Sequence, residues 1–205
     1  MSKLDEAREY VGTTPVSGAA QFALLVRAGM RPESRLLEYG CGALHLARLA
    51  AWYLDPDHYC AVEPNGWLIG AAFDADPEME RMTLDRLASF RGYDNFNARD
   101  FDVREFDYIF AHSVLSHAAA WQLPQFFSEA RAVLAPGGLI VASLRLGPDT
   151  NASEWVYPSV TWFSEETLHR EADIAGLRLS VLPEVRRHYS ALCPDEVHDW
   201  IIAWS

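Results

Sequence analysis

The chain has 205 residues, of which 50% are hydrophobic and 22% are charged, and its formal net charge is −12 at pH 7. This length and composition fit one globular α/β domain with a sizeable core, and they exclude a chain that is disordered throughout. No cluster of lysine and arginine interrupts the negative charge, which disfavours nucleic-acid and anionic-membrane partners. We therefore expect a single domain over residues 1–205, with no nucleic acid and no membrane as partner.

The three cysteines, Cys41, Cys60 and Cys193, lie far apart in the sequence. Neither a CxxC pair nor a Cys/His cluster accompanies them, so the sequence predicts no zinc site and no dithiol redox chemistry. The residues after Met1 are polar, and no apolar run approaches membrane-spanning length. We expect a cytoplasmic protein, whose oligomeric state the sequence leaves open.

Two helices are expected ahead of the first strand. Residues 4–11 have amphipathic spacing that ends before Pro15, and residues 18–29 form a more apolar helix that ends at Gly29. Residues 1–33 are therefore expected to form an N-terminal helical cap.

A βαβ unit follows this cap. Residues 35–39 form a short apolar strand, a Gly-Cys-Gly turn occupies residues 40–42, residues 43–54 have helical spacing, and residues 59–62 form a second strand. Such a unit forms a parallel sheet with a right-handed crossover helix.

The alternation of helices and strands continues to the C-terminus. The further elements expected are a helix at 67–73, a polar helix or loop through 92, a strand at 106–111, a helix at 123–134 that stops before the Pro-Gly-Gly at 136–138, a strand at 139–144, a helix at 165–175, and strands at 177–182 and 200–204. The pattern predicts a doubly wound α/β fold, with a mostly parallel seven-stranded sheet and helices on both faces.

Residues at the ends of the first two strands point to a nucleotide ligand. Gly40 and Gly42 allow positive backbone angles and a close approach of a ligand to the main chain, beyond the carboxyl end of a strand. Glu63 lies 21 residues beyond Gly42, the spacing at which an acid reaches a ribose diol. His45 occupies the third glycine position of the dinucleotide fingerprint GxGxxG, which argues against a nicotinamide-dependent reductase.

Five segments in order resemble the motifs of the class I S-adenosylmethionine-dependent methyltransferases. LLEYGCGALHLARL (36–49) resembles their first motif, an acid followed by GxGxG, with Leu44 in place of the third glycine. CAVEPN (60–65) resembles the second motif and NARDFD (97–102) the third. FDYIFAHSVLSHA (106–118) resembles the strand and loop beside the methionine moiety, and ARAVLAPGGLIVAS (130–143) resembles the helix, turn and strand that close the half-domain.

The resemblance implies an enzyme that transfers a methyl group from S-adenosylmethionine to a small-molecule acceptor, on oxygen rather than nitrogen. The implied cofactor contacts are Glu38, Gly40, Cys41 and Gly42 at the methionine end, Glu63, Pro64 and Asn65 at the ribose, Asp100 and Phe101 at the adenine, and Ala111, His112 and Ser113 near the sulfonium. Two alternatives stay open: a cofactor-binding module without catalysis, and, less favoured, the nicotinamide-dependent reductase.

His112 and His117 are the acid-base candidates, because histidine titrates near neutral pH and can accept the proton of a hydroxyl group. Both follow the strand at 106–111, at the edge of the sheet where the cofactor is expected. The competing interpretation, that each histidine only packs against or caps a helix, is the stronger one from the sequence alone.

Aromatic residues gather in the loop at 146–165. Trp155, Tyr157 and Trp162 suit a lid or substrate wall for an apolar acceptor, although a cluster that merely anchors the loop explains them as well. We also expect Tyr10 in the substrate site and Gln21 over the cofactor.

Asp149 and Asn151 raise the possibility of a divalent metal. No third acid stands in a recognisable position, so the sequence predicts no metal site, and a polar turn accounts for both residues.

Overall fold

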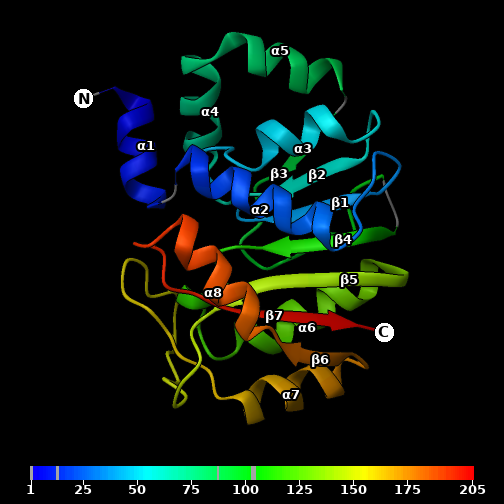
Figure 1. Ribbon diagram of the computed structural model, residues 1–205, viewed down its shortest axis with the longest axis vertical. Helices are drawn as coiled ribbons and strands as arrows, with labels where there is room; N and C mark the ends of the chain where they lie inside the picture. The colour runs from blue at the N-terminus through cyan, green and yellow to red at the C-terminus, as the bar shows by residue number, and fades with distance from the viewer. Residues whose placement is uncertain (1, 13, 87, 103–104) are drawn as a thin grey trace.

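The computed structural model describes residues 2–12, 14–86, 88–102 and 105–205. Within these residues, seven strands form one sheet in the order β3-β2-β1-β4-β5-β7-β6 (Figure 1). The strands are β1 (Leu36–Tyr39), β2 (Tyr59–Val62), β3 (Ser89–Arg91), β4 (Phe106–Ala111), β5 (Leu134–Leu144), β6 (Arg178–Val181) and β7 (Asp199–Trp204). β7 runs antiparallel to β5 and β6, and the other pairs are parallel. The predicted α/β class and seven-stranded sheet are confirmed, and the sheet is mixed.

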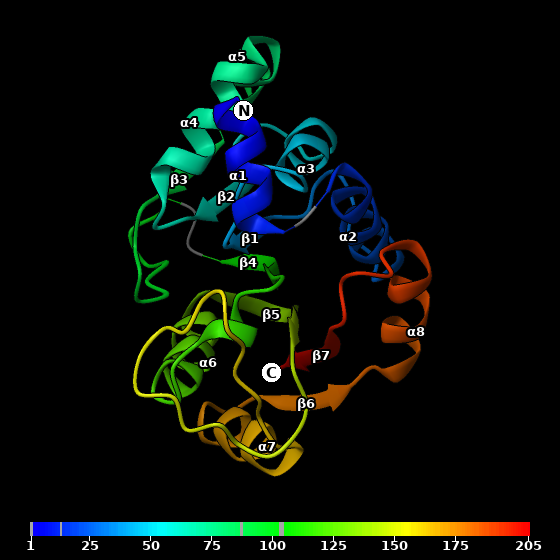
Figure 2. The ribbon, with the colours of Figure 1, turned by 90° about the vertical axis from the view of Figure 1, so that its left-hand side faces the viewer.

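Helices cover both faces of this sheet. They are α1 (Lys3–Val11), α2 (Pro15–Arg27), α3 (Ala47–Tyr53), α4 (Gly66–Ala75), α5 (Pro77–Asp85), the short 3-10 helix η1 (Leu115–His117), α6 (Gln122–Val133), α7 (Glu165–Ile174) and α8 (Pro183–Leu192). Figure 2 shows α2 and α8 on one side of the sheet and α6 on the other. None of the helices in the described part of the chain is both long and apolar enough to span a bilayer.

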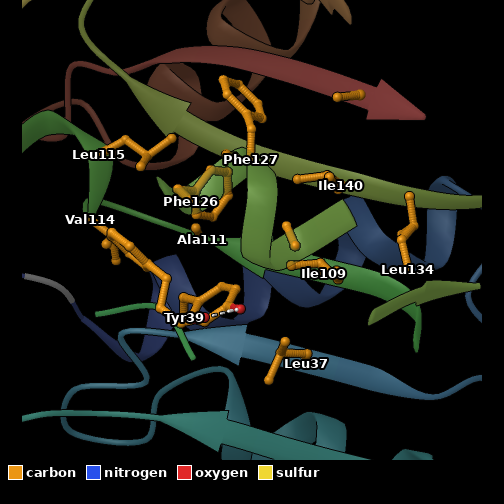
Figure 3. Packing of buried hydrophobic residues seen from close by; sticks show 14 of the residues in the cluster. Leu37, Tyr39, Ile109, Ala111, Val114, Leu115, Phe126, Phe127, Leu134 and Ile140 are labelled. Carbon is orange, nitrogen blue, oxygen red and sulfur yellow. Dashed lines mark hydrogen bonds between the residues drawn. The ribbon is translucent and has the colours of Figure 1, made fainter. Parts of the chain in front are cut away.

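The two faces of β1 belong to two separate apolar cores. Leu37 and Tyr39 are buried in the core that includes Phe126 of α6, as Figure 3 shows, whereas Leu36 is buried in the core that includes Leu25 of α2. Successive side chains of a strand point to opposite faces, so a strand covered on both sides is apolar throughout. The four buried residues of β1 explain why this strand is recognisable from its sequence.

The helix predicted at 43–54 begins later, at Ala47. Leu44 has a positive φ of 63°, which is incompatible with a helix, so residues 43–46 form turns instead. The N-cap position of the helix is Leu46.

Three elements differ from the prediction because their sequences lack the apolar pattern that marks a helix or a strand. β3 is a three-residue strand of half-buried side chains where a polar helix or loop was expected. α8 was not predicted, because its side chains are mostly polar and only Tyr189 is buried. β5 begins at Leu134 and includes the Pro-Gly-Gly segment, where Gly137 has a φ of 76° and the register with β4 shifts.

Candidate active site

A pocket of about 540 Å³ opens beyond the carboxyl ends of β1, β2 and β4. The chain reaches its walls directly after these strands, at Gly40, Glu63 and His112. β1 has β2 on one side and β4 on the other, so the strand order reverses here, which is where open α/β sheets bind ligands. The volume is typical of a small-molecule site.

The turn after β1 has the backbone conformation that glycine favours. Gly40 has a φ of 73° and Gly42 a φ of 51°, and both line the pocket. A side chain at Gly42 would lie 2.9 Å from Val11 of α1, so the close packing of the N-terminal helix also requires glycine here. Leu44, at the expected third glycine, adopts the same left-handed conformation without being glycine.

The Glu63 carboxylate is held in place by main-chain donors. Its Oε2 accepts a hydrogen bond from the Gly42 N–H at 2.9 Å, and its Oε1 accepts one from the Asn65 N–H at 2.9 Å. Each oxygen keeps a lone pair, and Glu63 lines the pocket together with Pro64 and Asn65. Glu63 therefore offers two oriented acceptors, as a ribose diol requires.

Glu38 lies deeper in the same wall. Its side chain accepts a hydrogen bond from the Tyr59 hydroxyl at 2.5 Å. Burial raises the pKa of Glu38 to about 7, the Tyr59 hydrogen bond opposes this shift, and the nearby Glu63 adds to it. The carboxyl group is therefore partly protonated near neutral pH, and a cationic group arriving in the pocket would favour its ionised form.

The expected adenine contacts lie outside the pocket. Phe101 is buried in the core against Phe106, and the Arg91 guanidinium lies over its ring. The Asp100 carboxylate accepts hydrogen bonds from the Tyr93 hydroxyl and from Asn97. Neither residue lines the pocket, although Tyr93, the partner of Asp100, does, so their contact with adenine stays a prediction.

Four other residues line this end of the pocket: Tyr93, Asp94, Asn95 and Phe96. The sequence motifs did not point to them. They belong to the irregular segment after β3, whose composition carries no pattern that marks a binding residue. Ala111 is also absent from the lining, because it ends β4 inside the core with no exposed surface.

His117 faces the pocket from η1 with its tautomer fixed by the main chain. Its Nδ1 lies 2.7 Å from the Ser159 carbonyl oxygen, so Nδ1 carries the proton and donates it. The other nitrogen, Nε2, is then an acceptor, 3.4 Å from the hydroxyl of Ser113, which also lines the pocket. Burial lowers the pKa of His117, and the charge of Arg145 adds to this shift, so the ring is neutral at neutral pH.

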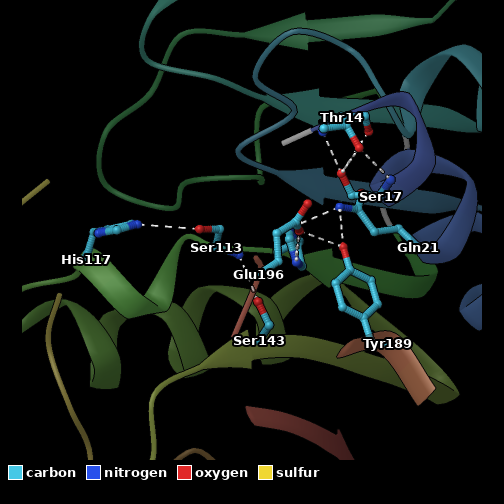
Figure 4. A network of polar contacts seen from close by, with 9 residues as sticks. Thr14, Ser17, Gln21, Ser113, His117, Ser143, Tyr189 and Glu196 are labelled. Carbon is cyan, nitrogen blue, oxygen red and sulfur yellow. Dashed lines mark hydrogen bonds and ion pairs between the residues drawn. The ribbon is translucent and has the colours of Figure 1, made fainter. Parts of the chain in front are cut away.

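His112 also lines the pocket, but both of its ring nitrogens face protein groups. Nδ1 lies 3.0 Å from Gln21 Nε2, and Nε2 lies 3.6 Å from Glu196 Oε2. Figure 4 shows Gln21, Tyr189 and Glu196 together in this network, and Ser113 joined to both His117 and Ser143. Of the two candidate histidines, His112 has both ring nitrogens directed at buried side chains, whereas the free nitrogen of His117 faces only the hydroxyl of Ser113, which itself lines the pocket.

Aromatic rings close the outer side of the pocket. The rings of Tyr10 of α1 and Tyr157 of the 146–165 loop are tilted against each other at 4.8 Å between centroids, and Tyr157 packs at 4.9 Å against His117. Trp155 lines the same wall, 5.8 Å from His117. Trp162 does not line the pocket, because its ring packs against Gly147 in the loop, and its contact with a substrate stays a prediction.

Asp149 serves a local turn. Its carboxylate accepts hydrogen bonds from the Ser164 N–H and the Thr167 hydroxyl, where Ser164 is the N-cap of α7. These contacts fit the polar-turn interpretation of Asp149.

Comparison with known protein families identifies the class of enzyme to which this chain belongs. The methyltransferase domain family matches residues 17–180, which include every strand from β1 to β5 and the whole glycine turn. The chain belongs to this family. The resemblance to S-adenosylmethionine-dependent methyltransferases is thereby confirmed, for the enzyme class and for the cofactor, and the nicotinamide-dependent reductase is set aside. No curated protein sequence matches this methyltransferase.

Solved structures share the fold of this methyltransferase along nearly its whole length. A DhpI complex with SAH is 20% identical, with 98% of this chain and 92% of that chain covered and a TM-score of 0.63. The CcbJ methyltransferase from Streptomyces caelestis is 15% identical, with coverage of 100% and 96% and a TM-score of 0.66. DesVI from Streptomyces venezuelae is 18% identical, with coverage of 97% and 95% and a TM-score of 0.62.

Proposed function

We propose that this methyltransferase methylates a hydroxyl group of a small molecule, with His117 as the general base. The observation that carries this proposal is the orientation of His117. Its Nδ1–H is bound to the Ser159 carbonyl oxygen, which leaves a neutral Nε2 beside the pocket. A hydroxyl group must lose its proton as its oxygen is methylated, and a neutral imidazole within reach accepts that proton.

The pocket residues fit the cofactor at two places. We propose that Glu63 accepts hydrogen bonds from the ribose hydroxyls and that Glu38 faces the methionine end, in line with the motif resemblance. Gly40, Cys41 and Gly42 line the pocket between these two acids. When bound, S-adenosylmethionine supplies a methyl group that its sulfonium activates. The chain itself then has to hold both partners in line, exclude water and remove one proton.

The acceptor would lie against His117 and the aromatic rings packed around it. Tyr10, Trp155 and Tyr157 come from α1 and from the 146–165 loop, so residues 1–33 would act as a cap and residues 146–165 as a lid over the acceptor. Aromatic side chains bury much surface with little loss of rotamer entropy, which suits an acceptor with an apolar body. Ser113 would mark the position of the acceptor hydroxyl, because its own hydroxyl lies 3.4 Å from the base.

Turnover of S-adenosylmethionine carrying a labelled methyl group, measured with a panel of small hydroxyl and amine acceptors, tests the proposal. We expect label in the hydroxyl compounds, and we expect His117→Gln to abolish most of it without weakening the binding of S-adenosylhomocysteine. Transfer only to amines would contradict the hydroxyl assignment. Tight cofactor binding without transfer to any acceptor would favour the non-catalytic binding module instead.

A further inference from the structure

Three metal-ligating side chains converge beside the pocket. His112 follows β4, whereas Glu196 and His198 precede β7. Because β7 is antiparallel, its first residue lies at the same edge of the sheet as the last residues of its parallel neighbours, which brings the two segments together. One ligand atom from each of the three residues lies within 4.8 Å of the other two.

The cluster is closed off from solvent. His112 and His198 are each 7% exposed, and the Glu196 side chain is 10% exposed. Among the described residues, neither Nε2 of His112 nor Nδ1 of His198 has a hydrogen-bond partner. Buried polar groups normally have partners, so two such nitrogens in one cluster call for an explanation.

Two imidazole nitrogens and one carboxylate oxygen meet in the cluster. A neutral histidine nitrogen and a carboxylate oxygen are ligands that divalent transition metals accept.

Neighbouring side chains orient two of the three ligands. Gln21 lies 3.0 Å from the Nδ1 of His112, and the Tyr189 hydroxyl donates to Glu196 at 2.9 Å (Figure 4). If the Gln21 amide is rotated by 180°, its oxygen accepts from the Nδ1–H of His112 and leaves Nε2 with a lone pair. Such support of the ligands is typical of protein metal sites.

We propose that His112, Glu196 and His198 bind one divalent transition-metal ion, with Zn²⁺ as the probe of choice. The 3.6 Å between His112 Nε2 and Glu196 Oε2 is close to the separation of about 3.3 Å that tetrahedral ligands have at bond lengths of about 2.0–2.1 Å. Two histidines and one carboxylate leave at least one coordination position for water or another oxygen ligand. The ion also fixes His112, and with it one wall of the pocket.

Calorimetric titration of untagged, chelator-treated full-length protein with Zn²⁺ tests this proposal without any assay of methyl transfer. We expect one ion per chain, and we expect Glu196→Gln and His198→Gln each to weaken its binding at least 100-fold. His188→Gln is the matched control, because His188 is exposed on α8, and it is expected to bind as wild type does. Equal affinity in all variants, or no stoichiometric binding to wild type, would overturn the site.

The wild-type protein alone gives a second test, which does not depend on whether the variants fold. X-ray absorption of the Zn²⁺ complex is expected to show two imidazole ligands with nitrogen or oxygen neighbours at about 2.0–2.1 Å. Sulfur ligation would instead place the ion at a cysteine and would rule the cluster out. Methyl transfer can fail in either case without affecting these results.

Discussion

The Glu63 carboxylate and the Gly42 N–H are joined across two strand ends by a hydrogen bond of 2.9 Å. This bond fixes the glycine turn after β1 against the acid after β2. The bond from Asn65 restrains the second oxygen of the same carboxylate. The side chain is thus oriented in the absence of a ligand, which lowers the entropy lost when hydroxyl groups bind to it.

Glu63→Ala is expected to weaken the binding of S-adenosylhomocysteine by about 1–3 kcal/mol, because charge-assisted hydrogen bonds to the ribose are lost. Calorimetric titration measures the change. Glu184→Ala, at an exposed position of α8, serves as the control and is expected to leave affinity unchanged. An unaltered dissociation constant in a folded Glu63→Ala protein would refute the ribose assignment.

Cofactor affinity is expected to rise with pH because of Glu38. Its carboxyl group faces the Tyr59 hydroxyl, Glu63 and the Cys41 thiol in a fully buried setting, and burial raises its pKa to about 7. The cationic methionine end of the cofactor favours the carboxylate, so binding below pH 7 releases a proton, and affinity increases by up to about tenfold per pH unit.

Calorimetry at pH 6.5 in two buffers of different ionisation enthalpy counts the released protons. Glu38→Gln is expected to remove the release and flatten the pH dependence. Wild-type binding with neither proton release nor pH dependence would show that Glu38 does not face a cation.

The same carboxyl group is expected to limit the stability of the free protein. Its folded pKa of about 7 lies above the unfolded value of 4.5, so the folded state binds the proton more tightly, and stability is lost as the pH rises from about 4.5 to 7. Glu38→Gln keeps an acceptor for the Tyr59 hydroxyl without the charge. Urea unfolding at pH 8 should therefore show a gain of about 1–3 kcal/mol over wild type. A variant that is less stable than wild type at pH 8 would contradict the buried charge.

The glycine turn and its acid were predictable because they are local in sequence. The strand over residues 59–62 was predicted with the bounds that β2 has, and Glu63 follows it directly. β3 escaped prediction because three half-buried residues at a sheet edge produce no apolar run. For α8, the signals were Pro183 at its first position, which is a preferred place for proline, and the helical spacing of Val185 and Tyr189 in an otherwise polar segment.

The histidine and glutamate cluster could not be read from the sequence. Glu196 and His198 lie two residues apart just before β7, but His112 is more than 80 residues away. Only the antiparallel course of β7 brings the two segments to one edge of the sheet. The displacement of Asp100 and Phe101 from the pocket is likewise set by packing, since Phe101 fills the core beside Phe106.

The acid limb of the pH–rate profile is expected to belong to His117. Arg145 and His198 act electrostatically near this ring, and Tyr157 packs against it, while burial lowers its pKa below 6.5. The neutral form is the base, so at saturating S-adenosylmethionine kcat/KM for the acceptor falls as the pH drops through this lowered pKa and is level above it. His117→Gln should reduce kcat by about 10²–10⁴-fold and remove the limb.

The control for this variant is His169→Gln, an exposed position on α7, which should keep the wild-type profile. Binding of S-adenosylhomocysteine should change less than twofold in both variants. If His117→Gln retained the acid limb at reduced kcat, another group would be the base and His117 would only position the acceptor.

Leu44 is expected to respond unusually to glycine. Leu44 is fully buried, so truncation to alanine removes packing worth about 2–5 kcal/mol and keeps a strained φ of 63°. Glycine also removes the Cβ but relieves strain of about 1–2 kcal/mol, which offsets the larger chain entropy of glycine. Leu44→Gly and Leu44→Ala should therefore unfold in urea with similar free energies.

Leu46, 1% exposed with a φ of −74°, supplies the comparison, because Leu46→Gly should be about 1 kcal/mol less stable than Leu46→Ala. An equal gap between glycine and alanine at both positions would mean that the left-handed turn is not strained.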